Sequence, residues 1–87
     1  MWIILENGTA VNTERVAKFY VVFVDGNASK SIPDKFYVYA AYGQRTTEIA
    51  SFDNQKDAQR LIKNIVDEIA DETAFLRIGP VEDTPNA

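Results

Sequence analysis

The stretch DNQKDAQRLIKNIVDEIADE, residues 53–72, decides the fold of this chain. Its apolar residues recur three and four positions apart, a spacing that places them on one face of a helix. These positions are Ala58, Leu61, Ile62, Ile65, Val66 and Ile69. Asp53 suits the N-cap, because its carboxylate can accept hydrogen bonds from the free N–H groups of the first turn. The pattern predicts one long amphipathic helix. Four of its side chains are expected to be buried under a sheet: Leu61, Ile62, Ile65 and Ile69.

Short runs of β-branched and aromatic residues fill the first 52 positions, and such runs favour strands. We expect strands at 2–6, 9–11, 16–24, 35–42 and 46–52. Asn7-Gly8 is typical of a two-residue type I′ hairpin turn, which would pair Ile4 with Val11. The polar residues 12–14 predict a corner after the second strand, and residues 25–34 predict a long loop.

The second hairpin and the end of the chain carry weaker signals. Gly43-Gln44 suits a type II′ turn, with glycine at the first central position. That register pairs Val38 with Ile49 and Tyr39 with Glu48. Residues 74–78 are consistent with either a short edge strand or an extended tail that packs on the domain. We expect residues 1–80 to form a single domain and residues 81–87 to be a flexible acidic tail.

These segments predict an α+β fold. Its sheet would be antiparallel, or a small and partly open barrel, with about five strands covered by one C-terminal amphipathic helix. Side chains alternate between the two faces of a strand, so one face should lie under the helix. The residues expected on that helix face are Phe19, Val21, Phe23, Phe36, Val38 and Ile49.

The opposite face carries the most informative pattern in the chain. Tyr20, Val22, Tyr37 and Tyr39 alternate onto it, and we call this set the tyrosine face. One helix covers one face only, and a monomer rarely exposes an apolar patch of more than a few hundred Å². Either the sheet closes into a barrel, or this face docks on a partner or a second copy. We predict a symmetric homodimer with these four residues as its interface.

Composition argues against catalysis. The sequence contains no histidine and no cysteine, which removes the usual general base, the commonest metal ligand and any thiolate. Residues 25–36 begin like a calcium loop, but Lys30 and Phe36 stand where that loop needs glycine and glutamate. No glycine-rich phosphate loop is present. We therefore expect a non-enzymatic protein without a cofactor or a metal.

A second interpretation of the tyrosine face is binding to single-stranded nucleic acid. Lys18 and Lys35 accompany its tyrosines, and aromatic side chains on sheets can stack with bases while lysines contact phosphates. The formal net charge of −4 argues against it, and Glu48 lies opposite Tyr39 on the same face. Nucleic acid is therefore an unfavoured partner.

The C-terminal end of the helix is acidic. Asp67, Glu68, Asp71 and Glu72 lie there, although the helix dipole disfavours negative charge at this end. A pair between Lys63 and Asp67, four positions apart, would offset part of that cost. The cluster is either a tolerated feature of the surface or an acidic site that docks on a basic partner.

The sequence contains no run typical of a targeting signal. The apolar run at residues 1–5 lacks a basic lead and is too short for a signal peptide. No apolar run approaches the about 18 residues of a membrane span. We expect a cytoplasmic protein that does not enter a membrane.

One resemblance adds to this interpretation. The run Trp2-Ile3-Ile4-Leu5 with Asn7-Gly8 and Val11-Asn12, followed by Phe52-Asp53 and the amphipathic helix, resembles a recurrent type of short uncharacterised protein. Such proteins occur in Gram-positive bacteria and their phages. The resemblance covers the first hairpin and the start of the helix. It implies a cytoplasmic protein of bacterial or prophage origin, and it carries no catalytic residues to transfer.

Three functions follow from these observations. The first is a protein-interaction module that forms a homodimer. The second is a small acidic inhibitor of phage type, similar in principle to anti-CRISPR proteins, that docks on a basic nucleic-acid-binding protein. The third is a binder of single-stranded nucleic acid.

Overall fold

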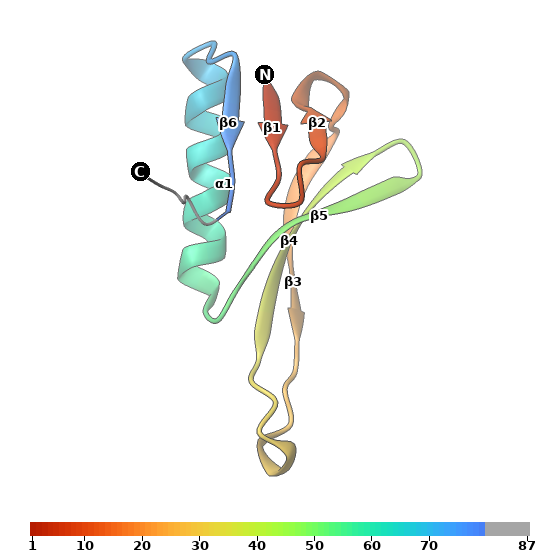
Figure 1. Cartoon of the computed structure of the whole chain (residues 1–87), viewed down its shortest axis with the longest axis vertical. Coiled ribbons are helices and arrows are strands. Elements are labelled where there is room, and N and C mark those ends of the chain that lie inside the picture. Colours follow the sequence, from red (N-terminus) through yellow and green to blue (C-terminus); the bar gives the residue numbers. More distant parts are fainter. Residues whose placement is uncertain (80–87) are drawn as a thin grey trace.

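The computed structural model describes residues 1–79 and confirms the α+β class (Figure 1). Its elements are β1 (Trp2–Ile4), β2 (Ala10–Asn12), β3 (Lys18–Val24), β4 (Lys35–Tyr42), β5 (Arg45–Phe52), α1 (Gln55–Ala70) and β6 (Phe75–Arg77). Two short 3-10 helices, η1 (Thr13–Arg15) and η2 (Ala28–Lys30), lie in the connections. Within residues 1–79 the strands form two open sheets of three strands each instead of the expected single sheet or barrel, whereas the C-terminal helix and the approximate number of strands agree with the prediction.

The small sheet has the strand order β2-β1-β6. β6 runs parallel to β1, with Trp2 opposite Phe75, so of the two alternatives left open for residues 74–78 the structure has the short edge strand. Parallel neighbours require a long crossover, and the large sheet and α1 lie within this one. In the small sheet, the first strand of the described chain therefore pairs with the last.

The first hairpin has a different register from the one expected. Ile3 lies opposite Val11, and Ile4 lies opposite Ala10, so the expected pair of Ile4 with Val11 is wrong. The Gly8 N–H donates to the Leu5 carbonyl at 2.9 Å, and Gly8 has a φ of 89°. These features belong to a three-residue loop, a turn followed by a left-handed glycine, which is one residue longer than the expected turn.

The large sheet has the order β3-β4-β5. β3 and β4 form a long antiparallel hairpin whose far end, with η2 and residues 25–34, extends away from the rest of the fold (Figure 1). β2 and β3 follow each other in the chain but do not pair, because η1 redirects the chain between them. Asn12 caps η1 by accepting a hydrogen bond from the Glu14 N–H at 3.1 Å, which confirms the polar corner.

The hairpin of β4 and β5 follows its expected register only near the turn. Tyr39 lies opposite Glu48, as expected, and Gly43 has the positive φ of 61° that a type II′ turn requires at this position. The register then shifts between Val38 and Tyr39. Val38 lies opposite Ala50 instead of Ile49, so Ile49 is the extra residue of a β-bulge.

The helix begins one residue later than expected. Asn54, not Asp53, is the N-cap, and its side-chain oxygen accepts a hydrogen bond from the Asp57 N–H at 2.9 Å. Asp53 instead forms an ion pair with Lys35 at 2.9 Å. Both residues are good capping types, so local preference alone could not choose between them.

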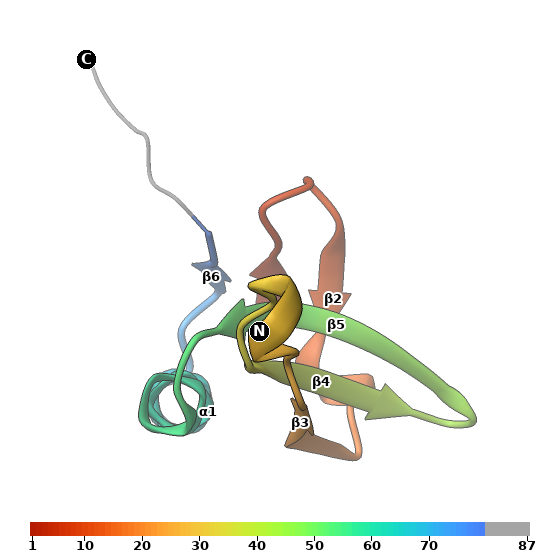
Figure 2. The ribbon, with the colours of Figure 1, turned by 90° about the horizontal axis from the view of Figure 1, so that it is seen from below.

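One core joins the two sheets and the helix. It contains Ile3, Leu5, Val11, Val38, Ala40, Ile49, Ala58, Ile65 and Ile78. Val38 and Ala40 belong to the helix face of the large sheet, so both α1 and the small sheet pack on that face. Figure 2 shows α1 and β6 on the same side of β3 and β4. Ile65 is fully buried, Leu61 and Ile62 are half-buried, and Ile69 is 40% exposed, which corrects its expected burial.

The expected flexible tail at residues 81–87, and the last residue of the expected domain at position 80, lie outside the described residues. Within residues 1–79, no helix has both the length and the apolar character that crossing a membrane requires.

Candidate functional site: the tyrosine face

The tyrosine face lies on the side of the large sheet opposite the core. Tyr20 lies directly opposite Tyr39, and Val22 lies directly opposite Tyr37. Residues directly opposite in a ladder share a face, so the structure brings all four predicted interface residues together. Each of them is half-buried, and Val22 lies outside the core cluster.

The aromatic rings of this face cover one another. The ring centroids of Tyr20 and Tyr39 lie 5.8 Å apart with an interplanar angle of 25°, and those of Tyr37 and Tyr39 lie 6.3 Å apart. The Lys18 Nζ lies 5.0 Å from the centroid of the Tyr20 ring, within the range of a cation–π contact. These neighbours explain why the rings are half-buried without any helix above them. They form one continuous aromatic surface over β3 and β4.

Charged residues lie at the two outer strands of the tyrosine face. Glu48 on β5 lies opposite Tyr39, next to the aromatic surface. Lys18 on β3 lies at the other edge, opposite Ala41. Opposite charges therefore flank the aromatic centre on its two sides.

An ion pair closes one end of this face. The Lys35 Nζ donates a hydrogen bond to the Asp53 carboxylate at 2.9 Å. This hydrogen bond, together with the negative charge of Asp53, raises the pKa of Lys35 above its usual value. The lysine is therefore engaged within the chain, which reduces its value as a contact for phosphate.

At the end of β4, the small sheet covers the helix face. Tyr42 and Arg15 line a small pocket of about 230 Å³ with Trp2 and the strand β2. The Tyr42 hydroxyl is hydrogen-bonded to the Thr47 hydroxyl at 2.8 Å. The small sheet thus meets the large sheet on the side opposite the tyrosine face. In the described part of the chain, neither this sheet nor α1 covers the tyrosine face.

The predicted acidic docking residues lie together at the end of α1, but two of them are engaged. Asp67 forms an ion pair with Lys63 at 2.8 Å, and this hydrogen bond raises the pKa of Lys63. Glu68 accepts a hydrogen bond from the Thr73 hydroxyl at 2.6 Å. Asp71 and Glu72 are exposed, and Glu72 has a left-handed φ of 59°. Two of the four carboxylates therefore stabilise the helix end.

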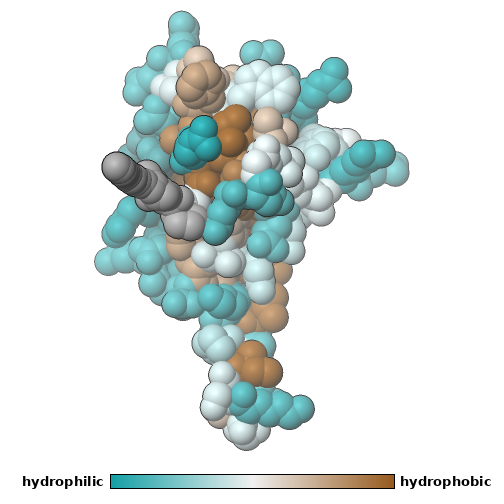
Figure 3. Space-filling model, in the orientation of Figure 1, coloured by the Kyte–Doolittle hydropathy of each residue, from teal (hydrophilic) through white to brown (hydrophobic). Residues whose placement is uncertain are grey.

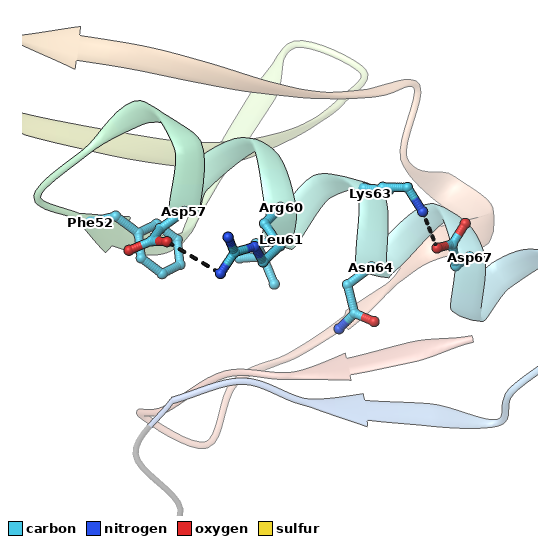
Figure 4. A pocket seen from close by; sticks show the side chains of 7 residues that line it. All are labelled: Phe52, Asp57, Arg60, Leu61, Lys63, Asn64 and Asp67. Carbon is cyan, nitrogen blue, oxygen red and sulfur yellow. Dashed lines mark hydrogen bonds and ion pairs between the residues drawn. The ribbon is translucent and has the colours of Figure 1, made fainter.

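A groove along α1 was not expected from the sequence. It has a volume of about 520 Å³, and Phe52, Leu61 and Asn64 contribute to its lining. Figure 4 shows these side chains in a row along the helix, with one ion pair toward each end. The pairs join Arg60 to Asp57 at 3.7 Å and Lys63 to Asp67 at 2.8 Å. The charges of the groove therefore neutralise each other.

The small sheet exposes an aromatic pair that sequence reasoning also missed. Trp2 is 48% exposed and Phe75 is 68% exposed, and the two lie opposite each other. Figure 3 shows hydrophobic surface gathered over this part of the molecule. The pair arises because β6 returns to β1 from the far end of the chain, and no local pattern signals that return.

Metal and catalytic sites are not evident in this geometry. Across residues 1–79, no group of three or more acidic, histidine or cysteine side chains is placed to hold a metal ion. The expectation of a non-enzymatic protein stays a prediction. Comparisons with protein-family models, with curated proteins and with solved structures find no match to this chain.

Proposed function

We propose that this protein is a non-enzymatic protein-interaction module that forms a homodimer through its tyrosine face. The observation that supports this most is the placement of Tyr20, Val22, Tyr37 and Tyr39 on one sheet face that α1 and the small sheet leave open. Tyrosine suits such a surface, because its ring can be buried while its hydroxyl reaches water or polar groups at the edge.

The size of the face predicts a weak dimer. β3 is seven residues long, and three strands of this length cover about 23 by 14 Å. Such a patch is at the low end of the areas that protein interfaces bury. We therefore expect a dissociation constant in about the micromolar range rather than a permanent dimer.

The charges of the face are complementary to a second copy of the same face. Two sheets that pack face to face keep their strands roughly aligned. A two-fold axis parallel to β4 would place β3 of one copy over β5 of the other. Lys18 of each copy would then lie near Glu48 of its partner, while the Tyr39 rings would meet at the centre. This arrangement places two pairs of opposite charges in the dimer, one at each side of the aromatic centre.

The experiment is sedimentation velocity over a range of protein concentrations. The wild type is expected to shift from monomer to dimer, and Val22→Glu is expected to stay monomeric because it places a charge in an apolar interface. Circular dichroism should show that the variant keeps its helix. Val66→Glu is the matched control, because Val66 is 52% exposed on α1 and away from this face.

Two results would contradict the proposal. A wild type that remains monomeric at high micromolar concentration has no dimer of the proposed strength. A Val22→Glu variant that unfolds, while Val66→Glu stays folded, would make Val22 part of the folded core instead of an interface.

The two other functions remain predictions with less support. For an inhibitor that docks through its acidic end, only Asp71 and Glu72 are free of the partners that engage Asp67 and Glu68. For nucleic-acid binding, Lys18 already lies over the Tyr20 ring, where a base would have to stack. Glu48 would also lie close to the phosphates, which is unfavourable.

A further inference from the structure

The outer edge of β5 is an open strand edge. β5 is the last strand of the large sheet, and β4 is its only partner among the described residues. Along a strand, alternate residues direct their N–H and C=O groups away from such a partner. Within residues 1–79, no backbone hydrogen bond connects β5 to any segment other than β4. An edge of this kind is a template to which another extended chain can be added.

A groove runs along this edge, and we call it the β5 groove. It has a volume of about 640 Å³, which falls in the range of ligand sites. Five consecutive residues, 48–52, line it. Side chains of consecutive strand residues point to opposite faces, so a wall that includes Ala50, Ser51 and Phe52 follows the edge of β5 rather than one of its faces. The groove therefore presents the main chain of β5 to a ligand.

The opposite wall comes from the small sheet. Leu5, Glu6 and Asn7 follow β1, and Ile78 and Gly79 follow β6. These two segments are held together, because the Ile78 N–H donates a hydrogen bond to the carbonyl of Ile4 at 2.8 Å.

Gly79 fixes the position of Glu6 in this wall. A Cβ at position 79 would lie 2.8 Å from the Glu6 Cβ, so only glycine permits this close approach. The backbone and Cβ of Glu6 therefore lie against Gly79, and the exposed Glu6 side chain lines the groove.

The charge of the β5 groove is negative. Glu6 and Glu48 line it, and within residues 1–79 no lysine or arginine does. Phe52 connects it to the neighbouring groove on α1, whose charges are already paired with each other. The apolar residues Leu5 and Ile49 at its floor are almost inaccessible to solvent, each being 5% exposed. Recognition would therefore depend on backbone hydrogen bonds and on positive charge rather than on deep apolar pockets.

We propose that the β5 groove binds an extended segment of a partner protein that carries lysine or arginine, and that this segment adds to β5 as a further strand. The bulge at Ile49 interrupts the regular spacing of backbone groups, so pairing is expected over residues 50–52. Main-chain hydrogen bonds would supply the affinity, and the two glutamates would select the positive charge. This site differs from the tyrosine face, although Glu48 lies beside both.

The test uses the full chain and a phage-displayed library of random heptapeptides as the probe. Selected peptides are expected to alternate β-branched residues with lysine or arginine. On binding, they should shift the amide signals of residues 50–52 in nuclear magnetic resonance spectra and slow the hydrogen exchange of some of these amides. Slower exchange distinguishes an added strand from contact with side chains alone.

Glu6→Lys tests the charge without changing the tyrosine face. It is expected to weaken binding of a selected peptide about threefold, as for one exposed ion pair. Glu14→Lys is the matched control, because Glu14 is exposed on η1 and the substitution changes the net charge by the same amount. It should leave binding unchanged.

Three results would overturn the proposal. The library could yield no peptide that binds. The selected peptides could be acidic, or could bind Glu6→Lys as tightly as the Glu14→Lys control. The shifted amides could lie on the tyrosine face or around Trp2 and Phe75 instead of β5.

Discussion

The two faces of the large sheet are made by the same three strands but differ in what covers them. The helix face contributes Val38 and Ala40 to a core in which α1 and the small sheet also take part. The tyrosine face has no cover within residues 1–79, and its side chains are half-buried only because they lie against one another. The difference is that one face belongs to the core, while the other is where we propose that a second copy binds.

The largest expected effect is a loss of stability on substitution of a core residue that packs on the helix face. Ile65 is fully buried under the large sheet, so Ile65→Ala leaves a cavity and should cost about 2–5 kcal/mol of unfolding free energy. Leu61→Ala should cost less, because Leu61 is half-buried. Urea unfolding followed by circular dichroism measures both losses.

Val66→Ala on the same helix is the control. Val66 is 52% exposed, and its loss should stay within about 0.5 kcal/mol. If Ile65→Ala and Val66→Ala destabilised the protein equally, the helix would not pack on the sheet in the way the structure describes.

The features of the fold that depend on local pattern could be predicted from the sequence. Spacings of three and four located the helix to within two residues at its N-terminus, because the stripe from Ala58 to Ile65 is long and regular. Strict alternation in β3 and β4 placed Tyr20, Val22, Tyr37 and Tyr39 on one face, because the period of a strand is two residues.

The features that depend on contacts between distant residues could not be predicted in the same way. The pairing of β1 with β6 has no local signal in the sequence. It places β1 and β2 in a separate sheet, where a single sheet was expected. The register of the first hairpin changed because Asn7-Gly8 also fits a three-residue loop. The β5 groove arises only when both sheets are in place, because segments next to both of them line it. Sequence patterns therefore predicted the tyrosine face but not the groove.

A smaller effect concerns the charges at the sides of the tyrosine face. Lys18→Glu and Glu48→Lys should each weaken the dimer by about 0.2–1 kcal/mol, the range of exposed ion pairs. The double variant exchanges the two charges and should recover most of the lost affinity, because the pair is restored across the two-fold axis. Sedimentation at low salt measures all four proteins. Additive losses without recovery would mean that the two side chains do not meet in the dimer.

The smallest effect is the pH dependence of the ion pair between Lys35 and Asp53. The pKa of Lys35 is raised in the folded protein, so the pair stabilises the fold fully below the ordinary lysine pKa of 10.5. This stabilisation disappears as the pH rises through the raised pKa, where the amine becomes neutral. The melting temperatures of wild type and Lys35→Gln should therefore differ slightly at pH 7 and converge at high pH. A difference that is unchanged at high pH would show that the effect of this substitution is not electrostatic.

The most direct test of the account is a disulfide across the proposed two-fold axis. The chain has no cysteine, so a single introduced cysteine can only cross-link one copy to another. Tyr39 lies on the central strand of the tyrosine face, whereas Phe75 is more exposed but lies on the small sheet. Under mild oxidation, Tyr39→Cys is expected to form a covalent dimer much faster than Phe75→Cys. Dilution should slow this cross-linking only at protein concentrations low enough for the non-covalent dimer to dissociate. If Phe75→Cys cross-linked at the same rate or faster, the tyrosine face would not be the interface.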